Sequence, residues 1–219
     1  MTARLDASRL WWGVFHLLAA APVVLMVWDY STNNLTYNPI REITFRTGRT
    51  ALLFLVGSLA VTPVGAILGW AALRRFRRPL GLYAFLYALL HFLTFVGLDY
   101  GFDWALIQGA LFQNRYALVG LAAFLLLAPL AITSTNGWVR RLGGRRWRRL
   151  HQLVYVAALL AVLHYVWLVK ADVRVPLAYG AVVVVLLLLR LPVVRRGVSR
   201  LGSRVRGESR TCDGETRSS

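Results

Sequence analysis

Cysteine and acidic residues are scarce in this 219-residue sequence, and each shortage excludes a class of protein. The single cysteine, Cys212, excludes a disulfide within the chain, an iron–sulfur cluster and a cysteine-based zinc site. Charged residues make up 16% of the chain, against the ~25% usual in soluble domains, whereas hydrophobic residues make up 58%. This length and composition predict one domain that lies in a membrane.

Nucleotide-binding and nucleic-acid-binding motifs are also missing. Neither a GxGxxG after a strand nor a Walker loop occurs, so the sequence carries no recognisable nicotinamide or ATP site. The net charge of +17 resides in short segments between apolar runs and no nucleic-acid motif accompanies it, which argues against a nucleic-acid partner. The longest connection, at 29–48, is too short for a soluble catalytic domain.

Six apolar runs have the length that a helix needs to cross ~30 Å of hydrocarbon. They predict transmembrane helices at 10–28, 49–69, 80–98, 116–135, 150–169 and 175–192. The first run is longer than the apolar segment of a signal peptide, so we predict that it is retained. The predicted fold class is an all-α integral membrane protein, a bundle of six transmembrane helices.

The arginines predict the orientation of this bundle. Twenty of the 26 basic residues lie in the N-terminal tail, the second-to-third connection, the fourth-to-fifth connection and the segment from Arg190 onward. The positive-inside rule places these segments, and hence both termini, in the cytoplasm, where they also meet anionic lipid. We therefore expect a cytoplasmic tail at 1–9, a membrane domain at 10–195 and a disordered cytoplasmic tail at 196–219.

Histidine is the residue in the predicted spans that is best suited to bind a metal. The four histidines are His16 in the first span, His91 in the third, and His151 and His164 in the fifth. No Asp, Glu or Lys lies inside an apolar span, although a proton pump or ion-coupled transporter usually keeps carboxylates there. Neutral imidazole is a strong axial ligand for heme iron, so the pattern favours a heme protein.

The depths of the histidines suggest how they pair. At ~1.5 Å per residue, His91 and His164 lie at similar depth in the outer half, where they are predicted to clamp one heme between two helices. His16 and His151 lie in the inner half. They either serve a second heme or are ordinary interfacial histidines, and His151 has the further alternative of holding a propionate or a lipid headgroup. About 140° separates His151 from His164 around an ideal helix, so the helix must bend or the two sites must face different neighbours.

Two arginines are candidates for binding the carboxylates of a heme. Arg49 is predicted at the outer end of the second helix, and Arg115 at the outer start of the fourth. Arginine binds carboxylates through a planar fork of N–H donors, which suits heme propionates. For each, an ordinary loop arginine at the level of the lipid headgroups is the alternative.

Several segments, taken together, resemble one known family. They are 47–52 (TGRTAL), 62–63 (TP), 78–82 (RPLGL), 90–91 (LH), 115–116 (RY), 129–135 (PLAITST), 147–151 (WRRLH) with Tyr155, and 164–165 (HY) with Lys170. Over residues 10–195 the order and spacing of these segments resemble the MsrQ (YedZ) family. Its members are the heme-binding membrane subunits of the bacterial periplasmic methionine-sulfoxide reductase system, within the ferric-reductase-like transmembrane superfamily.

The resemblance implies a b-type cytochrome of the inner membrane, with His91, His151 and His164 as axial ligands of one or two hemes. It implies that electrons pass from the quinone pool or a cytoplasmic flavin reductase to a periplasmic molybdenum-cofactor subunit, MsrP, which reduces methionine sulfoxide in oxidised proteins. Binding of flavin mononucleotide (FMN) is associated with the family and rests on the resemblance alone, because no flavin motif is present. The chain is then an electron-transfer subunit rather than the catalytic one.

Two alternatives remain open. One is a b-type cytochrome that serves another acceptor, such as ferric iron. The other is a small transporter or structural membrane subunit without redox chemistry. Co-purification with a molybdenum-containing partner separates the first from the family function, and the absence of heme from the purified protein would favour the second.

Overall fold

The computed structural model describes residues 2–169 and 172–190, which are mostly helical with no strand among them. The long helices are α1 (Thr2–Ser31), α2 (Pro39–Ile67), α3 (Arg77–Leu93), α5 (Arg115–Ile132), α8 (Leu153–Leu168) and α9 (Arg174–Leu188). Shorter segments connect them: a 3₁₀ helix at Ala71–Phe76, a π-helical turn at Thr94–Asp99, α4 (Trp104–Gln113), α6 (Asn136–Leu142) and α7 (Gly144–His151). The predicted disordered tail at 196–219, with Cys212, lies outside the described residues.

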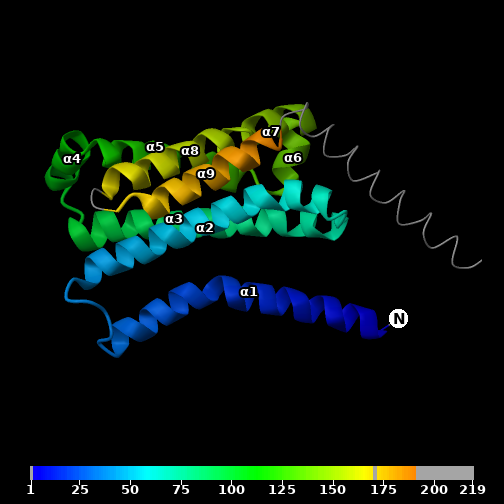
Figure 1. Cartoon of the computed structure of the whole chain (residues 1–219), viewed down its shortest axis with the longest axis horizontal. Coiled ribbons are helices and arrows are strands. Elements are labelled where there is room, and N and C mark those ends of the chain that lie inside the picture. The colour runs from blue at the N-terminus through cyan, green and yellow to red at the C-terminus, as the bar shows by residue number, and fades with distance from the viewer. Residues whose placement is uncertain (1, 170–171, 191–219) are drawn as a thin grey trace, which may run out of the picture.

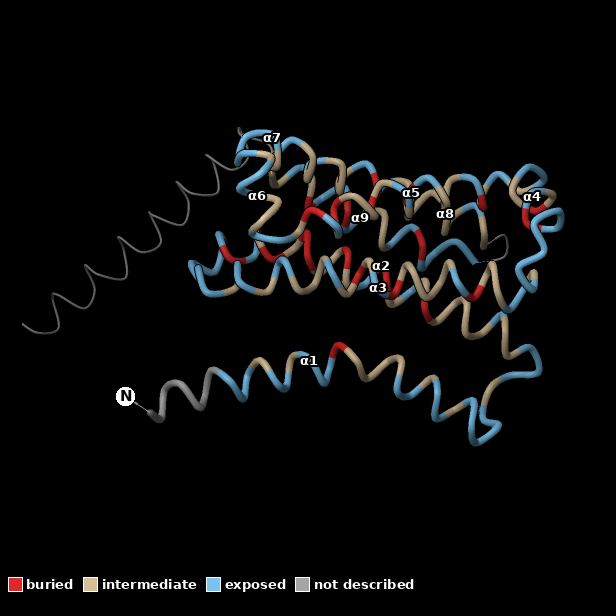
Figure 2. The backbone as a smooth tube through the Cα atoms, turned by 180° about the vertical axis from the view of Figure 1, so that it is seen from behind, coloured by how far each residue is buried: buried red, intermediate tan, exposed pale blue. Residues whose placement is uncertain are grey.

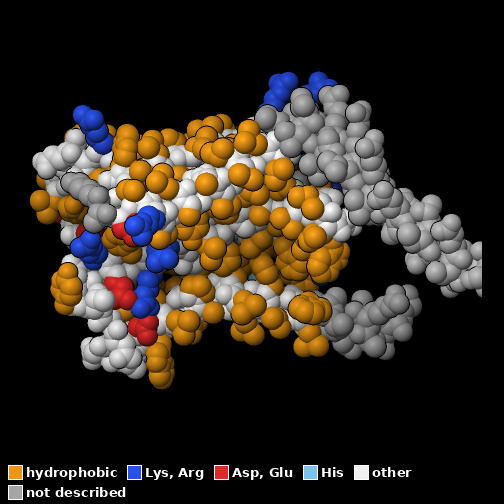
Figure 3. Space-filling view, viewed as in Figure 1, with side chains coloured by type: hydrophobic (Ala, Val, Ile, Leu, Met, Phe, Trp, Pro, Cys, Tyr) orange, Lys and Arg blue, Asp and Glu red, His pale blue; other side chains and the backbone are white. Residues whose placement is uncertain are grey.

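Five helical segments are long and apolar enough to cross a membrane: Arg9–Ser31, Pro39–Ile67, Ala71–Asp99, Arg115–Ile132 and Gly144–Leu168. They correspond to the first five predicted spans. The sixth corresponds to α9, which is apolar but has only 15 residues, so the six-span count and the orientation stay predictions. On the face shown in Figure 3, hydrophobic side chains cover the flank of the bundle, and the charged ones gather near its ends.

The core lies between α2, α3, α5, α8 and α9, and part of it is visible as buried segments in Figure 2. Its buried residues are Leu55, Leu59, Ala84, Leu127, Ala157, Ala158, Val183 and Leu186. Three of these are alanines that are almost wholly inaccessible. Small residues at such positions let helix backbones approach closely, which is how helices gain packing energy in lipid.

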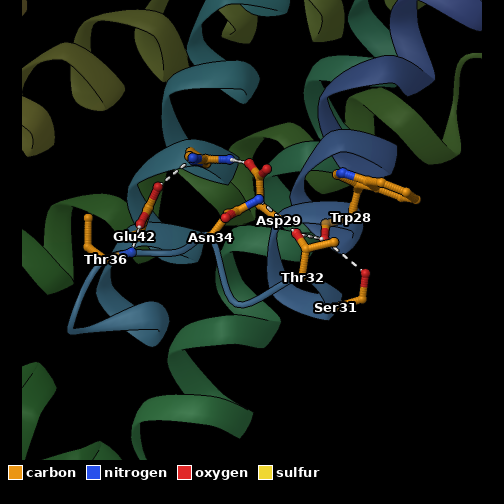
Figure 4. A network of polar contacts seen from close by, with 8 residues as sticks. Trp28, Asp29, Ser31, Thr32, Asn34, Thr36 and Glu42 are labelled. Atoms are coloured by element: carbon orange, nitrogen blue, oxygen red, sulfur yellow. Dashed lines mark hydrogen bonds and ion pairs between the residues drawn. The ribbon is translucent and has the colours of Figure 1, made fainter.

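Helix α1 lies apart from this core (Figure 1). The hydroxyl of Tyr87 on α3 donates to the Ala19 carbonyl at 2.8 Å, and the Tyr83 hydroxyl lies 2.8 Å from Nδ1 of His16. At the far end of α1, Asp29 pairs with Arg46 of α2, which also pairs with Glu42. Figure 4 shows Asp29 and Glu42 close to the connection between the two helices, with dashed lines that mark the ion pairs. Helix α1 is therefore attached mainly by a few polar and aromatic contacts.

Helix α2 begins ten residues before the predicted start at residue 49, which corrects that boundary. Asn38 caps the helix by accepting a hydrogen bond from the Arg41 amide at 3.0 Å, and Pro39 occupies the first helical position, which it favours. The added turns carry Glu42 and Arg46, whose charges pair with each other. Hydropathy alone places the start of the span too late, because it counts these charged residues as polar and takes no account of their pairing.

The two ends of the bundle differ. The arginine-rich α6 and α7 lie at the same end as the N-terminus, and α4 lies at the opposite end, which is also the end where α1 connects to α2 (Figure 1). The sequence predicted no helix at α4. Asp103 caps it by accepting hydrogen bonds from the amides of Ala105 and Leu106, and its ten residues are too few to produce a spanning signal.

Candidate functional site

A cavity of about 490 Å³ opens between α2, α3, α5 and α8, towards the end of the bundle that carries α4. Its walls include the aromatic rings of Phe92, Phe95 and Phe124. Phe92 and Phe124 stack with their ring centroids 4.9 Å apart. The volume and the mostly apolar lining are in the range of sites for small molecules and cofactors.

His91 and His164 face each other across this cavity. His91 comes from α3 and His164 from α8, and both line the cavity wall. Their ring centroids are 6.0 Å apart, and the two ring planes are inclined at 77°. The structure thus brings together the two histidines that the sequence paired by depth.

A backbone carbonyl of a neighbouring helix orients each ring. Nδ1 of His91 donates to the Thr44 carbonyl of α2 at 2.8 Å, and Nδ1 of His164 donates to the Tyr116 carbonyl of α5 at 2.7 Å. A carbonyl only accepts, so Nδ1 carries the proton in each neutral ring and Nε2 keeps its lone pair. Among the described residues no group bonds to either Nε2, which leaves both free to bind a metal from the cavity.

The separation of the rings suits one metal ion between them. A metal bound to both Nε2 atoms at about 2 Å each would hold the ring centroids roughly 6 Å apart. The observed separation of 6.0 Å therefore needs little adjustment. The described residues contain no group of three His, Cys, Asp or Glu that could hold a metal ion. The protein ligands at this site are the two imidazoles, and imidazole is an axial ligand of heme iron.

The two candidate arginines differ in their placement. Arg49 lines the cavity, but it lies ten residues inside α2 rather than at the outer end of that helix, because α2 begins at Pro39. Arg115 is the first residue of α5, next to Tyr116, and is not among the residues that line the cavity. Arg41, which falls in the connection predicted at 29–48, lines the cavity as well, with its guanidinium over the ring of Phe45.

His151 lies away from the cavity, towards the other end of the bundle. It is the last residue of α7, and its ring stacks on that of Trp147 at 3.9 Å between centroids. Its Nδ1 bonds to the Trp147 carbonyl at 3.2 Å, while its Nε2 is buried with no hydrogen-bond partner in the described chain. His151 stacks on Trp147, whereas His164 bonds to the Tyr116 carbonyl, so the two histidines face different neighbours.

His16 is not joined to His151 by any contact in the described part of the chain. It bonds to Tyr83, and its ring stacks on Trp12 at 5.8 Å between centroids. His16 is also exposed on the side of the bundle. The structure therefore does not assemble the pair that a second heme between His16 and His151 requires.

Sequence reasoning missed four residues of the site. Thr44 and Tyr116 act through their carbonyls, which leave no mark in the side-chain sequence. Gly48 and Gly120 lie against the two histidine rings. Glycine is unfavourable inside a helix, so a glycine within an apolar run is a signal of close packing. That signal could have marked Gly120 in the span at 116–135, whereas Gly48 lies just before the predicted span at 49–69.

Comparison with known proteins identifies the family of the chain. Residues 47–162, just over half of the chain, match the family model described as ferric reductase like transmembrane component. That matched region contains His91 and His151 but ends before His164.

Curated relatives match over most of their length. A Rhodospirillum rubrum protein named protein-methionine-sulfoxide reductase heme-binding subunit MsrQ is 46% identical, over 87% of this chain and 92% of that protein. Proteins with the same name from Xanthomonas oryzae pv. oryzae and Caulobacter vibrioides are 48% and 44% identical. These matches cover 78% and 86% of this chain, and 81% and 90% of the two relatives.

Proposed function

The chain belongs to the MsrQ family of heme-binding subunits within the ferric-reductase-like transmembrane proteins, and on that premise we propose that it is a b-type cytochrome that carries electrons across a membrane. The observation that carries the proposal is the pair of His91 and His164, 6.0 Å apart with both Nε2 atoms free. Two histidine ligands leave no open position on the iron, which suits electron transfer rather than oxygen binding.

Each part of the cavity has a role in this proposal. His91 and His164 hold the heme iron, and the carbonyls of Thr44 and Tyr116 keep Nδ1 protonated and thereby make Nε2 the ligating atom. The apolar walls exclude water. The bound heme supplies one-electron redox chemistry, and the protein supplies its ligands, its orientation and its electrostatic surroundings.

Arg49 is the propionate partner in this proposal, because it lines the same cavity as the two histidines. Arg115 has the same role by prediction only, since its place at the start of α5 is beside the cavity rather than in its wall. Replacing Arg49 by Gln, which removes the charge, is expected to weaken heme retention more than replacing Arg115 by Gln.

His151 is proposed as the ligand of a second heme. Its support is the buried Nε2 atom without a hydrogen bond, since a buried polar atom that lacks a partner carries a free-energy cost that a ligand would remove. The residue or molecule opposite His151 is left open, because His16 does not reach it.

We propose that electrons enter at the arginine-rich end of the bundle and leave near α4. The donors proposed are the quinone pool or a cytoplasmic flavin reductase, and the further cofactor proposed is FMN. The acceptor proposed is a molybdenum-cofactor methionine-sulfoxide reductase in the bacterial periplasm. Two observations support this direction. The relatives are named as subunits of a methionine-sulfoxide reductase, and the cavity lies towards the α4 end, which the predicted topology places on the periplasmic side of an inner membrane.

The first test is the visible spectrum of the detergent-purified protein, reduced minus oxidised, with heme quantified per chain. Sharp bands of a six-coordinate b-type cytochrome are expected. His91→Ala is expected to remove the heme of the cavity, and His16→Ala to leave it in place. A colourless protein, purified intact from cells supplied with a heme precursor, would overturn the proposed function.

The matched family also names ferric reductases, so transfer to ferric iron is the second candidate. Membranes that contain the reduced protein can be mixed with the purified molybdenum-containing subunit or with a ferric chelate. Reoxidation by the subunit, coupled to loss of methionine sulfoxide, supports the first function, and reoxidation by the chelate alone supports the second.

A further inference from the structure

We propose that Gly48 and Gly120 are positioning residues. Each lacks a side chain, and one imidazole ring lies against its helix in the space that this leaves. Together the two glycines hold the rings nearly perpendicular. This inference rests on the proposed function, because it concerns how His91 and His164 present Nε2 to a heme. Neither glycine touches the iron site directly.

The space at each glycine is occupied by a histidine ring. A Cβ atom added at Gly120 would lie 2.6 Å from Nδ1 and 2.8 Å from Cε1 of His164. A Cβ atom added at Gly48 would lie 3.1 Å from both Nδ1 and Cε1 of His91. The first pair of distances is shorter than any ordinary contact, and the second is tight, so each ring lies where a side chain would otherwise be.

The two halves of the site repeat one arrangement. Thr44, which accepts from His91, lies four residues before Gly48, and Tyr116, which accepts from His164, lies four residues before Gly120. Residues four apart share one face of a helix, one turn from each other. In each half, therefore, a carbonyl in one turn of the helix accepts a hydrogen bond from the ring, and a glycine in the next turn leaves the room that the ring occupies.

Conformational freedom does not explain these glycines. Both lie inside helices, and neither has the positive φ found at Gly69, Gly101 and Gly143. Glycine is the least favourable residue in a helix interior after proline, so alanine would suit both backbones better. The contact with a histidine ring is the feature that alanine would disturb.

The hydrogen bonds prevent the rings from moving away to accommodate a methyl group. The bond from His164 to the Tyr116 carbonyl is 2.7 Å long, and the clash at Gly120 involves the same Nδ1 atom. A methyl group there must push Nδ1 off its carbonyl and rotate Nε2 away from the cavity. At Gly48 a shift of a few tenths of an ångström is enough, so the effect is smaller.

The first experiment replaces each glycine by alanine and measures the visible and electron paramagnetic resonance (EPR) spectra of the oxidised protein. Gly120→Ala is expected to convert most of the cavity heme from six-coordinate low-spin to high-spin or to lose it, and Gly48→Ala to shift the EPR signal by less. Gly57→Ala, also on α2, is the matched control, because its new methyl group meets only Leu80 at 3.9 Å. It should leave both spectra unchanged.

The second measurement is made on the unmodified protein, and the variant His164→Ala serves only to assign the signal to the cavity heme. Axial imidazoles in perpendicular planes leave two iron orbitals nearly equal in energy and give a low-spin signal dominated by one large g value. Parallel planes give three well-separated g values. The planes at 77° predict the first form for the signal that disappears in His164→Ala.

The outcomes separate this inference from the function on which it rests. A low-spin cavity heme that is unchanged in Gly120→Ala, or that shows the three g values of parallel planes, overturns the inference and leaves the proposed function intact. A protein without heme overturns both. A low-spin heme that is lost or altered in Gly120→Ala but kept in Gly57→Ala, with the predicted single large g value, supports both.

Discussion

Replacing His164 by Gly tests the site most directly, because it removes one proposed ligand and leaves room for a free imidazole to take its place. The carbonyl of Tyr116, which holds Nδ1 at 2.7 Å, stays available to a free imidazole, and His91 remains on the other side. The variant thus keeps every part of the cavity except the ring.

The size of the effect follows from the number of ligands. Loss of a residue that hydrogen-bonds to a metal ligand typically weakens metal binding about 10–100-fold. Loss of one of the two ligands themselves should therefore weaken heme binding by roughly 100-fold or more, which corresponds to about 2.7 kcal/mol. A short tether supplies an effective concentration in the millimolar range, so restoring the site should take imidazole on the order of 10 mM.

The assay is heme per chain after purification with and without imidazole, read together with the reduced spectrum. His164→Gly is expected to lose the cavity heme without imidazole and to regain the six-coordinate spectrum with it. His16→Gly is the control, since His16 bonds to Tyr83 and not to the cavity, and it should keep its heme in both conditions. Full heme retention by His164→Gly without imidazole would refute the pairing with His91.

Three further predictions concern other parts of the molecule. His151→Ala should lower heme per chain without changing the EPR signal of the cavity heme, and a change in that signal instead would assign His151 to the cavity. Ala158→Leu should destabilise the fold by about 1–3 kcal/mol, because residue 158 has no exposed surface and an enlarged side chain forces α8 away from the core. Its melting temperature should fall, whereas that of Leu159→Ala, at a residue 45% exposed on the same helix, should change little. Cys212, the only cysteine, should react with a membrane-impermeant maleimide in inside-out vesicles but not in intact spheroplasts, and the reverse pattern would invert the predicted topology.

The positions of the helices were largely readable from the sequence because hydrocarbon imposes a length and a composition on any helix that crosses it. Five predicted spans match helices long enough to cross, and the arginine-rich α6 and α7 lie together at one end. The start of α2 was missed because Glu42 and Arg46 read as loop residues, although their pairing lets the helix extend through them. Helix α4 was missed because ten residues give no spanning signal.

The sequence by itself determined that histidines, and not carboxylates, are the polar groups best placed to bind a metal, and that His91 and His164 lie at one depth. Depth follows from counting residues along a helix, but the direction in which a ring points depends on its neighbours. Only the tertiary structure decided that the two rings face each other, that His151 faces Trp147, and that His16 is bonded to Tyr83. Two backbone carbonyls and two glycines set the orientation of the His91 and His164 rings. The sequence does not show which residue a backbone carbonyl bonds to, or which side chain packs against a glycine.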